Sequence, residues 1–264
     1  RKRMLKEKSV FLLDMDGTIY LGEELIFGAK EFLKHLKQQG KRYFFLTNNS
    51  SKNKKKYVEK LRRLGIEAKK EDVFTSGEAT TIVLNQRMSG GKIFLMGTPA
   101  LEEEFANAGF QLVKERDKEI DAVVLGFDTT LTYEKLWIAC DYIREKGKYI
   151  ATHPDFNCPL EGGKFMPDAG AMIAFIEAST GIVPEVIGKP NEKMIEAICN
   201  QYHLNRKDLV IVGDRLYTDI KTGENAEITS VLVLSGETSK EDYEASNILA
   251  DYIFPSVKEL GEAI

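Results

Sequence analysis

The chain has 264 residues, with 37 lysines and arginines against 41 aspartates and glutamates, so its formal net charge is -4. This balance excludes a strongly basic nucleic-acid-binding domain, and no apolar run reaches the ~18–20 residues that a membrane-spanning helix needs. With 43% apolar and 30% charged residues, the chain has the composition of a soluble globular protein of one or two domains.

The cysteines and the start of the chain carry little functional signal. Cys140, Cys158 and Cys199 lie far apart and form no CxxC pair. We therefore expect reduced thiols in a cytoplasmic protein rather than a disulfide framework or a zinc site. Residues 1–8 are basic, but Asp14 interrupts the apolar run behind them. We expect a frayed terminus ahead of Met4 and no secretory signal.

The first informative stretch runs from Val10 to Thr18. Four apolar residues lead directly into Asp14, Met15, Asp16 and Gly17. The apolar run predicts a short strand that is buried on both faces, as in a parallel sheet. Such a strand places its acids at the carboxyl edge of the sheet, where open α/β folds bind ligands. Two buried carboxylates need a cation beside them. We therefore expect a hard divalent cation and phosphate chemistry at this edge.

The rest of the chain alternates predicted strands and helices. Helices are expected at 28–39, 52–64, 99–108, 132–146, 170–179 and 191–202, with another from about 78. Strands are expected at 43–46, 72–77, 92–97, 121–128, 149–152, 184–190, 208–214, 230–234 and 252–254. Residues 155–168 read as a loop. The pattern restarts near Lys92, which indicates a second α/β unit with its own sheet.

Polar side chains follow four of these predicted strands. They are Asp14 with Asp16, Thr47 with Asn48, Lys189 alone, and Asp214 with Asp219. If the four strands share one parallel sheet, their ends meet at one edge. Carboxylates suit Mg²⁺, while a lysine, a hydroxyl and free N–H groups suit a phosphoryl group.

Four motifs carry a resemblance to a known family. They are residues 14–18 (DMDGT), 47–51 (TNNSS), 188–190 (GKP) and 213–219 (GDRLYTD). In this order, the chain resembles the haloacid dehalogenase-like hydrolases, in the branch of NagD-like and p-nitrophenyl phosphatases with a large α/β cap of C2 type. The resemblance implies an α/β fold with a Rossmann-like parallel-sheet core, at 1–79 and 185–264, and a smaller inserted α/β cap domain at 80–184.

The resemblance also implies an activity. It is Mg²⁺-dependent hydrolysis of small phosphorylated metabolites such as sugar phosphates or nucleotides, with p-nitrophenyl phosphate as an artificial substrate. Asp14 would be the nucleophile that forms an aspartyl-phosphate, and its other oxygen would bind the metal. Asp16 would exchange the proton with the leaving alcohol and then with water, and its backbone carbonyl would bind the metal. Asp214 would be a direct metal ligand.

Further residues have supporting roles by the same resemblance. Thr47 and Lys189 would hold the phosphoryl oxygens, and Asp219 would orient metal-bound waters or Lys189. Backbone N–H groups of Met15, Gly17 and Asn48 would reach the phosphate, and Thr18 would orient Asp16. An alternative for Gly17 is that it serves only the turn after the strand.

The cap is expected to close over the site and to select the leaving group. Its candidate residues are Asp128, His153 and Asp155. His153 departs from the Thr-Asn-x-Asp pattern of relatives, so it either contacts the substrate or is a surface or loop-packing histidine. We expect a small phosphorylated metabolite as partner, neither nucleic acid nor membrane, and a homodimer through the cap.

Three other functions remain open on the sequence. A phosphotransferase or mutase would use the same aspartyl-phosphate with an alcohol as acceptor. A receiver-like phosphoacceptor module also combines acids, a threonine and a lysine, although it is shorter and separates its acceptor aspartate from its acidic pair. A catalytically silent metal-binding module would keep the same motifs without turnover.

Overall fold

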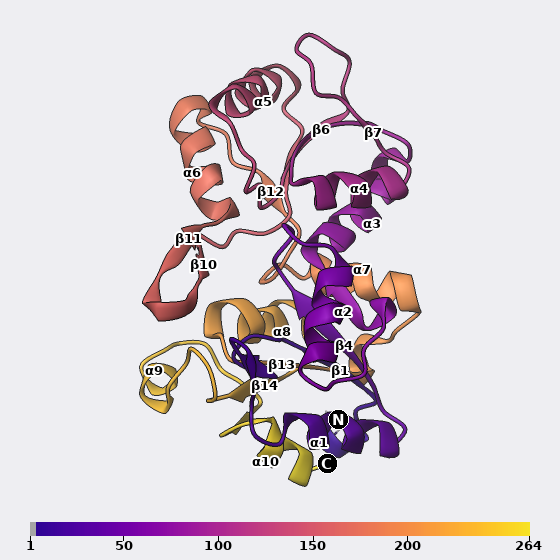
Figure 1. Cartoon of the computed structure of the whole chain (residues 1–264), viewed down its shortest axis with the longest axis vertical. Coiled ribbons are helices and arrows are strands. Elements are labelled where there is room, and N and C mark those ends of the chain that lie inside the picture. The colour runs from indigo at the N-terminus through magenta and orange to yellow at the C-terminus, as the bar shows by residue number, and fades with distance from the viewer. Residues whose placement is uncertain (1–3) are drawn as a thin grey trace. The chain divides into compact units, whose positions relative to one another are not determined.

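The computed structural model describes residues 4–264 (Figure 1), so the frayed start expected at residues 1–3 lies outside the described residues. The chain forms two compact units. The first unit contains the described residues up to Thr47 together with Lys54–Phe74 and Lys189–Ile264, and the second contains Asn48–Asn53 and Thr75–Gly188. Compactness alone does not define a folding domain, so the domain limits at 80 and 184 stay a prediction.

A six-stranded sheet in the order β15-β14-β13-β1-β4-β5 forms the centre of the first unit. The strands are β1 (Val10–Leu13), β4 (Arg42–Thr47), β5 (Val73–Thr75), β13 (Leu209–Gly213), β14 (Thr229–Val233) and β15 (Tyr252–Phe254). Strand β1 pairs in parallel with both β4 and β13, and all four of its residues are buried. The short strands β2 (Tyr20–Leu21) and β3 (Glu24–Leu25) form an antiparallel hairpin after β1.

Helices cover both faces of this sheet, which is the condition for a buried parallel sheet. They are α1 (Ala29–Gln38), α2 (Lys54–Arg63), α7 (Lys193–Tyr202), α8 (Lys221–Ala226), α9 (Lys240–Glu244) and α10 (Val257–Glu262), and a π-helical turn, Leu216–Ile220, precedes α8. Neighbouring residues of β4 show the two faces. Phe45 belongs to the apolar cluster with Phe32 of α1 and Leu61 of α2. Phe44 packs on Tyr202 of α7, with ring centroids 4.7 Å apart.

The second unit has its own parallel sheet, in the order β12-β9-β8-β6-β7. Its strands are β6 (Lys92–Met96), β7 (Gln111–Leu112), β8 (Ala122–Leu125), β9 (Tyr149–Ala151) and β12 (Glu185–Val186). Its helices are α3 (Ser76–Met88), α4 (Pro99–Asn107), α5 (Tyr133–Lys146) and α6 (Ala169–Thr180). Two parallel sheets, one inserted between parts of the other unit, confirm the predicted fold class.

Two local predictions are wrong. Residues 155–168, expected as a loop, contain an antiparallel hairpin of β10 (Asn157–Pro159) and β11 (Phe165–Pro167). Prolines suppress a strand prediction, but a two-stranded hairpin consists of edge strands, where proline is tolerated. The strand expected at 184–190 does not belong to the core sheet, because β12 pairs with β9 of the second sheet. Lys189 therefore follows a strand of the other sheet.

None of the helices within residues 4–264 is long and apolar enough to cross a bilayer.

Candidate active site

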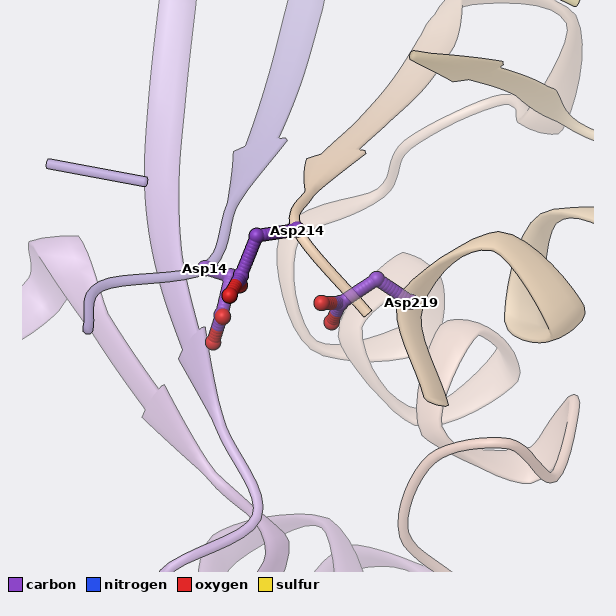
Figure 2. Close-up of side chains that lie close together, drawn as sticks. All are labelled: Asp14, Asp214 and Asp219. Carbon is purple, nitrogen blue, oxygen red and sulfur yellow. The ribbon is translucent and has the colours of Figure 1, made fainter. Parts of the chain in front are cut away.

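Three carboxylates meet at the carboxyl edge of the first unit's sheet. Asp14, Asp214 and Asp219 each offer an oxygen, and these oxygens lie within 4.8 Å of one another (Figure 2). Asp14 follows β1 and Asp214 follows β13, its neighbour in the sheet. The Asp14 amide continues the pairing by donating to Val212 O at 3.0 Å. The parallel register thus brings together two acids that are 200 positions apart in the sequence.

Lys189 reaches into this cluster with a buried side chain. Its Nζ donates to Asp219 Oδ1 at 2.8 Å, lies 3.4 Å from Asp14 Oδ1, and lies 3.5 Å from the Leu46 carbonyl oxygen of β4. The lysine therefore faces the predicted acids even though it does not follow a core strand. Arg215 also attracts all three carboxylates, so two cations face three carboxylates and an excess of negative charge remains.

The titration of the buried acids reflects this excess. Burial, followed by repulsion from Asp14 and Asp219, raises the pKa of Asp214 to about 9. Burial and then repulsion from Asp14 raise the pKa of Asp219 to about 6, although Lys189 acts in the opposite direction. Asp214 Oδ1 is buried and has no hydrogen-bond partner among the described residues. Hard divalent cations bind oxygen ligands of this kind, so the cluster could hold one.

Glycines allow the backbone to approach these carboxylates closely. A Cβ on Gly17 would lie 2.2 Å from Asp214 Oδ2, and the Gly17 φ of +90° is unfavourable for other residues. The Gly17 amide donates to Tyr20 O at 2.8 Å, so a phosphate oxygen would have to displace that bond. The contacts of Gly17 thus match its alternative role in the turn.

Asp16 and Thr18 lie near each other in sequence but are not connected by a hydrogen bond here. The Asp16 side chain is exposed, and its Oδ1 accepts from the Gly22 amide at 3.4 Å. Thr18 Oγ1 is buried and has no hydrogen-bond partner in the part of the chain that the structure describes. The predicted orientation of Asp16 by Thr18 is therefore absent from this conformation. Met15 is buried in the apolar cluster, and Thr47 is half-buried at the end of β4.

Other predicted residues lie in the second unit. Asn48 Nδ2 donates to Asp155 Oδ1 at 3.0 Å, and the Asn48 carbonyl accepts from Ser76 Oγ at 2.6 Å. Asp128 is buried, accepts from the Thr130 amide at 2.9 Å and pairs with Lys135 at 2.6 Å. Asp128 therefore has partners from its own loop and helix.

His153 is fully buried, which excludes a surface histidine, and its other two roles, loop packing and substrate contact, stay predictions. Its Nε2 lies 2.7 Å from Asp168 Oδ1, and its Nδ1 lies 2.8 Å from Thr152 Oγ1. Asp168 also accepts from the Ala169 amide at 2.6 Å, at the start of α6. Sequence reasoning missed Asp168, although an acid two residues before the predicted helix 170–179 is a signal for an N-cap.

Sequence reasoning also missed the turn after β14, residues Ser235–Thr238. The Glu237 amide donates to Asp214 Oδ2 at 2.8 Å, and the Thr238 amide donates to the Asp214 carbonyl at 3.2 Å. The signal in the sequence was the predicted strand 230–234, which is followed by small and polar residues. The strands before Asp14 and Asp214 are followed by polar residues in the same way.

The fold and the cluster together define a class of enzyme. A parallel α/β core that gathers three aspartates and a lysine at its carboxyl edge, with a second α/β unit inserted, is the arrangement that the resemblance to metal-dependent phosphatases implies. Comparison with known proteins agrees. Residues 11–111 match the family model described as haloacid dehalogenase-like hydrolase, and residues 186–260 match the one described as HAD-hydrolase-like. The chain belongs to the haloacid dehalogenase-like hydrolases, in their NagD and p-nitrophenyl phosphatase branch.

Individual relatives cover almost the whole chain. An acid sugar phosphatase of Staphylococcus aureus strain MRSA252 is 36% identical over 260 residues, which are 98% of each chain. The structure of a 4-nitrophenylphosphatase from Thermotoga maritima aligns with a TM-score of 0.92 and 46% identity, again over 98% of each chain. A Mycobacterium tuberculosis glycerol phosphate phosphatase in complex with magnesium gives a TM-score of 0.89 and 31% identity, over 96% of this chain and 76% of that one. The chain is thus a phosphatase, and a receiver-like module has no support.

Proposed function

We propose that the protein is a Mg²⁺-dependent phosphomonoesterase for small phosphorylated metabolites, sugar phosphates or glycerol phosphate, and that it also hydrolyses p-nitrophenyl phosphate. The observation that carries the proposal is the cluster of Asp14, Asp214, Asp219 and Lys189. The substrate class follows from the names of the relatives, which are an acid sugar phosphatase and a glycerol phosphate phosphatase. The core domain would comprise 1–79 and 185–264, and the cap domain 80–184.

The carboxylates fit a divalent ion. Asp14 and Asp214 would hold it together with the backbone carbonyl of Asp16, because Asp214 Oδ1 is buried without a hydrogen bond from residues 4–264 and the cluster carries excess negative charge. Magnesium in the structure of the Mycobacterium tuberculosis relative supports this choice of ion. When bound, Mg²⁺ would supply positive charge against the phosphoryl oxygens.

The residues of this chain divide the remaining chemistry. A carboxylate oxygen of Asp14 attacks phosphorus, and the bond between phosphorus and the leaving oxygen breaks. Asp16, whose side chain is exposed, protonates that oxygen and later removes a proton from the water that hydrolyses the aspartyl-phosphate. Lys189 and Thr47, with the amides of Met15 and Asn48, neutralise and orient the transferring group. Asp219 holds Lys189 in place.

The test is phosphate release from p-nitrophenyl phosphate by the full chain. We expect activity with Mg²⁺, loss of activity with EDTA, and loss in Asp14→Asn. Asp242→Asn, an exposed position on α9, is the matched control and should keep its activity. Activity that survives Asp14→Asn would overturn the nucleophile assignment, and activity that survives EDTA would overturn the metal assignment.

A second experiment separates hydrolysis from phosphotransfer. Sugar phosphates, glycerol phosphate and nucleotides are incubated with the enzyme, and both free phosphate and newly phosphorylated alcohols are measured. Stoichiometric release of free phosphate supports a hydrolase. Transfer to an added alcohol in preference to water would make the protein a phosphotransferase with the same intermediate.

Association into a homodimer through the second unit also remains a proposal. Tyr133 and Trp137 of α5 and Phe175 of α6 are 75%, 56% and 46% exposed, and the two helices pack against each other. Light scattering on the wild type and on Trp137→Glu tests it. A wild-type monomer would overturn the proposal.

A further inference from the structure

The turn Ser235–Thr238 encloses one side of Asp214, and none of the four sequence motifs contains it. Ser235 Oγ donates to the Gly17 carbonyl at 2.8 Å, which joins the turn to the loop after β1. The Glu237 amide donates to Asp214 Oδ2, as described above, and the Thr238 amide binds the Asp214 main chain. Both the backbone and the side chain of Asp214 are therefore held by the same turn.

The two oxygens of Asp214 have different surroundings as a result. Oδ2 lies between Gly17 and Gly236, since a Cβ on either glycine would come within 2.2 Å or 2.1 Å of it, respectively. Oδ1 is buried and has no hydrogen-bond partner among the described residues. The turn thus occupies one oxygen with an amide and leaves the other available within the acidic cluster.

The side chain of Glu237 connects the turn to Arg215 and Tyr217, in the segment that follows β13. Its carboxylate accepts from Tyr217 Oη at 3.1 Å and 3.0 Å, and Arg215 Nε lies 3.9 Å from Glu237 Oε2. The Arg215 amide in turn donates to Asp219 Oδ2 at 3.3 Å. These contacts fix the turn relative to the segment that carries Asp214 and Asp219.

We infer that the turn Ser235–Thr238 is a positioning element for the metal site, which presents Asp214 Oδ1 to a divalent cation while Tyr217 and Arg215 hold Glu237. The inference rests on the proposed function, because it assumes Asp214 to be a ligand of Mg²⁺. Mg²⁺ demands near-ideal octahedral geometry, so displacement of one carboxylate weakens binding. Partners that orient metal ligands typically change metal affinity about 10- to 100-fold when they are lost.

Gly236→Ala is the most direct test. Gly236 has no positive φ, but an added Cβ would lie too close to the Asp214 carboxylate and 2.7 Å from the Gly17 Cα, so the carboxylate and the loop after β1 have to shift. Calorimetric titration of the EDTA-treated, dialysed full chain with MgCl₂ measures the dissociation constant without substrate. We expect it to rise at least about 10-fold. Gly261→Ala, on α10 with its nearest contact at 3.3 Å to Phe32, is the control and should bind Mg²⁺ like the wild type.

Side-chain variants keep the test decisive if Gly236→Ala does not fold. Glu237→Ala and Tyr217→Phe remove the contacts that fix the turn and should raise the dissociation constant for Mg²⁺ by a smaller factor. Glu237→Gln keeps an acceptor for Tyr217 and should restore much of the affinity. Saturating Mg²⁺ should return kcat toward the wild-type value in each folded variant, which a general loss of structure would not allow.

The outcomes separate this inference from the proposed function. Wild-type phosphatase activity with unchanged Mg²⁺ affinity in folded Gly236→Ala, or in Glu237→Ala and Tyr217→Phe, would overturn the positioning role and leave the function intact. A wild type that neither binds Mg²⁺ nor hydrolyses phosphomonoesters would overturn the function itself, and the inference with it.

Discussion

Lys189 illustrates how single side chains govern this site. Its ammonium group lies between Asp219 and Asp14, and the residue as a whole is 3% exposed. A buried ion pair is weak evidence for stability, but removal of one partner leaves an uncompensated charge. The lysine therefore has two separable effects, one on the stability of the cluster and one on the binding of phosphate.

Lys189→Met should lower the free energy of unfolding by about 3–5 kcal/mol at about pH 8. The loss should be smaller at about pH 5, because Asp219, whose pKa is about 6 beside Lys189, becomes neutral there. Urea titrations at both pH values measure this. Lys221→Met removes an exposed pair with Glu224 and should change stability by about 1 kcal/mol or less. Equal losses in the two variants would contradict the buried-charge explanation.

At the scale of elements, the start of α6 depends on Asp168. This side chain caps the helix through the Ala169 amide and also accepts from His153, which follows β9. One carboxylate therefore joins a helix to the loop after a strand of the second sheet.

Asp168→Ala should destabilise the second unit by about 2 kcal/mol, since it removes a cap and leaves a buried histidine without one partner. Hydrogen exchange of the α6 amides should accelerate. Ser239→Ala removes the exposed N-cap of α9 and should lower the free energy of unfolding by about 1 kcal/mol. Faster hydrogen exchange should then be confined to the amides of that short helix. If the α6 amides exchange as slowly in Asp168→Ala as in the wild type, the Asp168 carboxylate does not stabilise the start of the helix.

At the scale of the whole molecule, the acidic cluster links stability to pH and to metal. In the metal-free folded state, burial and repulsion from Asp14 and Asp219 raise the pKa of Asp214 from its ordinary 3.8 to about 9. Between these values the folded protein binds more protons than the unfolded one, so the stability of metal-free protein falls as pH rises. Asp219 adds to this fall up to about pH 6.

We therefore expect the Tm of EDTA-treated protein to decrease from about pH 5 to about pH 8, and Mg²⁺ to raise Tm more at the higher pH. Asp214→Asn should flatten the dependence, because an amide does not titrate. Differential scanning calorimetry with and without Mg²⁺ measures both. An increase in Tm with pH that is the same in wild type and Asp214→Asn would contradict this assignment.

Local signals predicted most of the fold. The strands β1, β4, β6, β8 and β13 and most helices follow from apolar periodicity and from glycines and caps at their ends. Local signals failed for the hairpin β10–β11, whose prolines are tolerated at edge strands, and for the assignment of β12 to a sheet. A short apolar run has the same sequence pattern in either sheet. Only the strand that it pairs with decides to which sheet it belongs.

The sequence by itself determined that this is an α/β protein with acids at the ends of β1 and β13, since burial and parallel pairing place such acids at one edge. Only the tertiary structure decided which hydrogen-bond partners and surroundings each polar side chain has. It buried His153 against Asp168, left Thr18 Oγ1 without a hydrogen bond among the described residues, and folded the turn Ser235–Thr238 over Asp214. These contacts join residues from distant elements, and the geometry of such contacts depends on packing that no local pattern encodes.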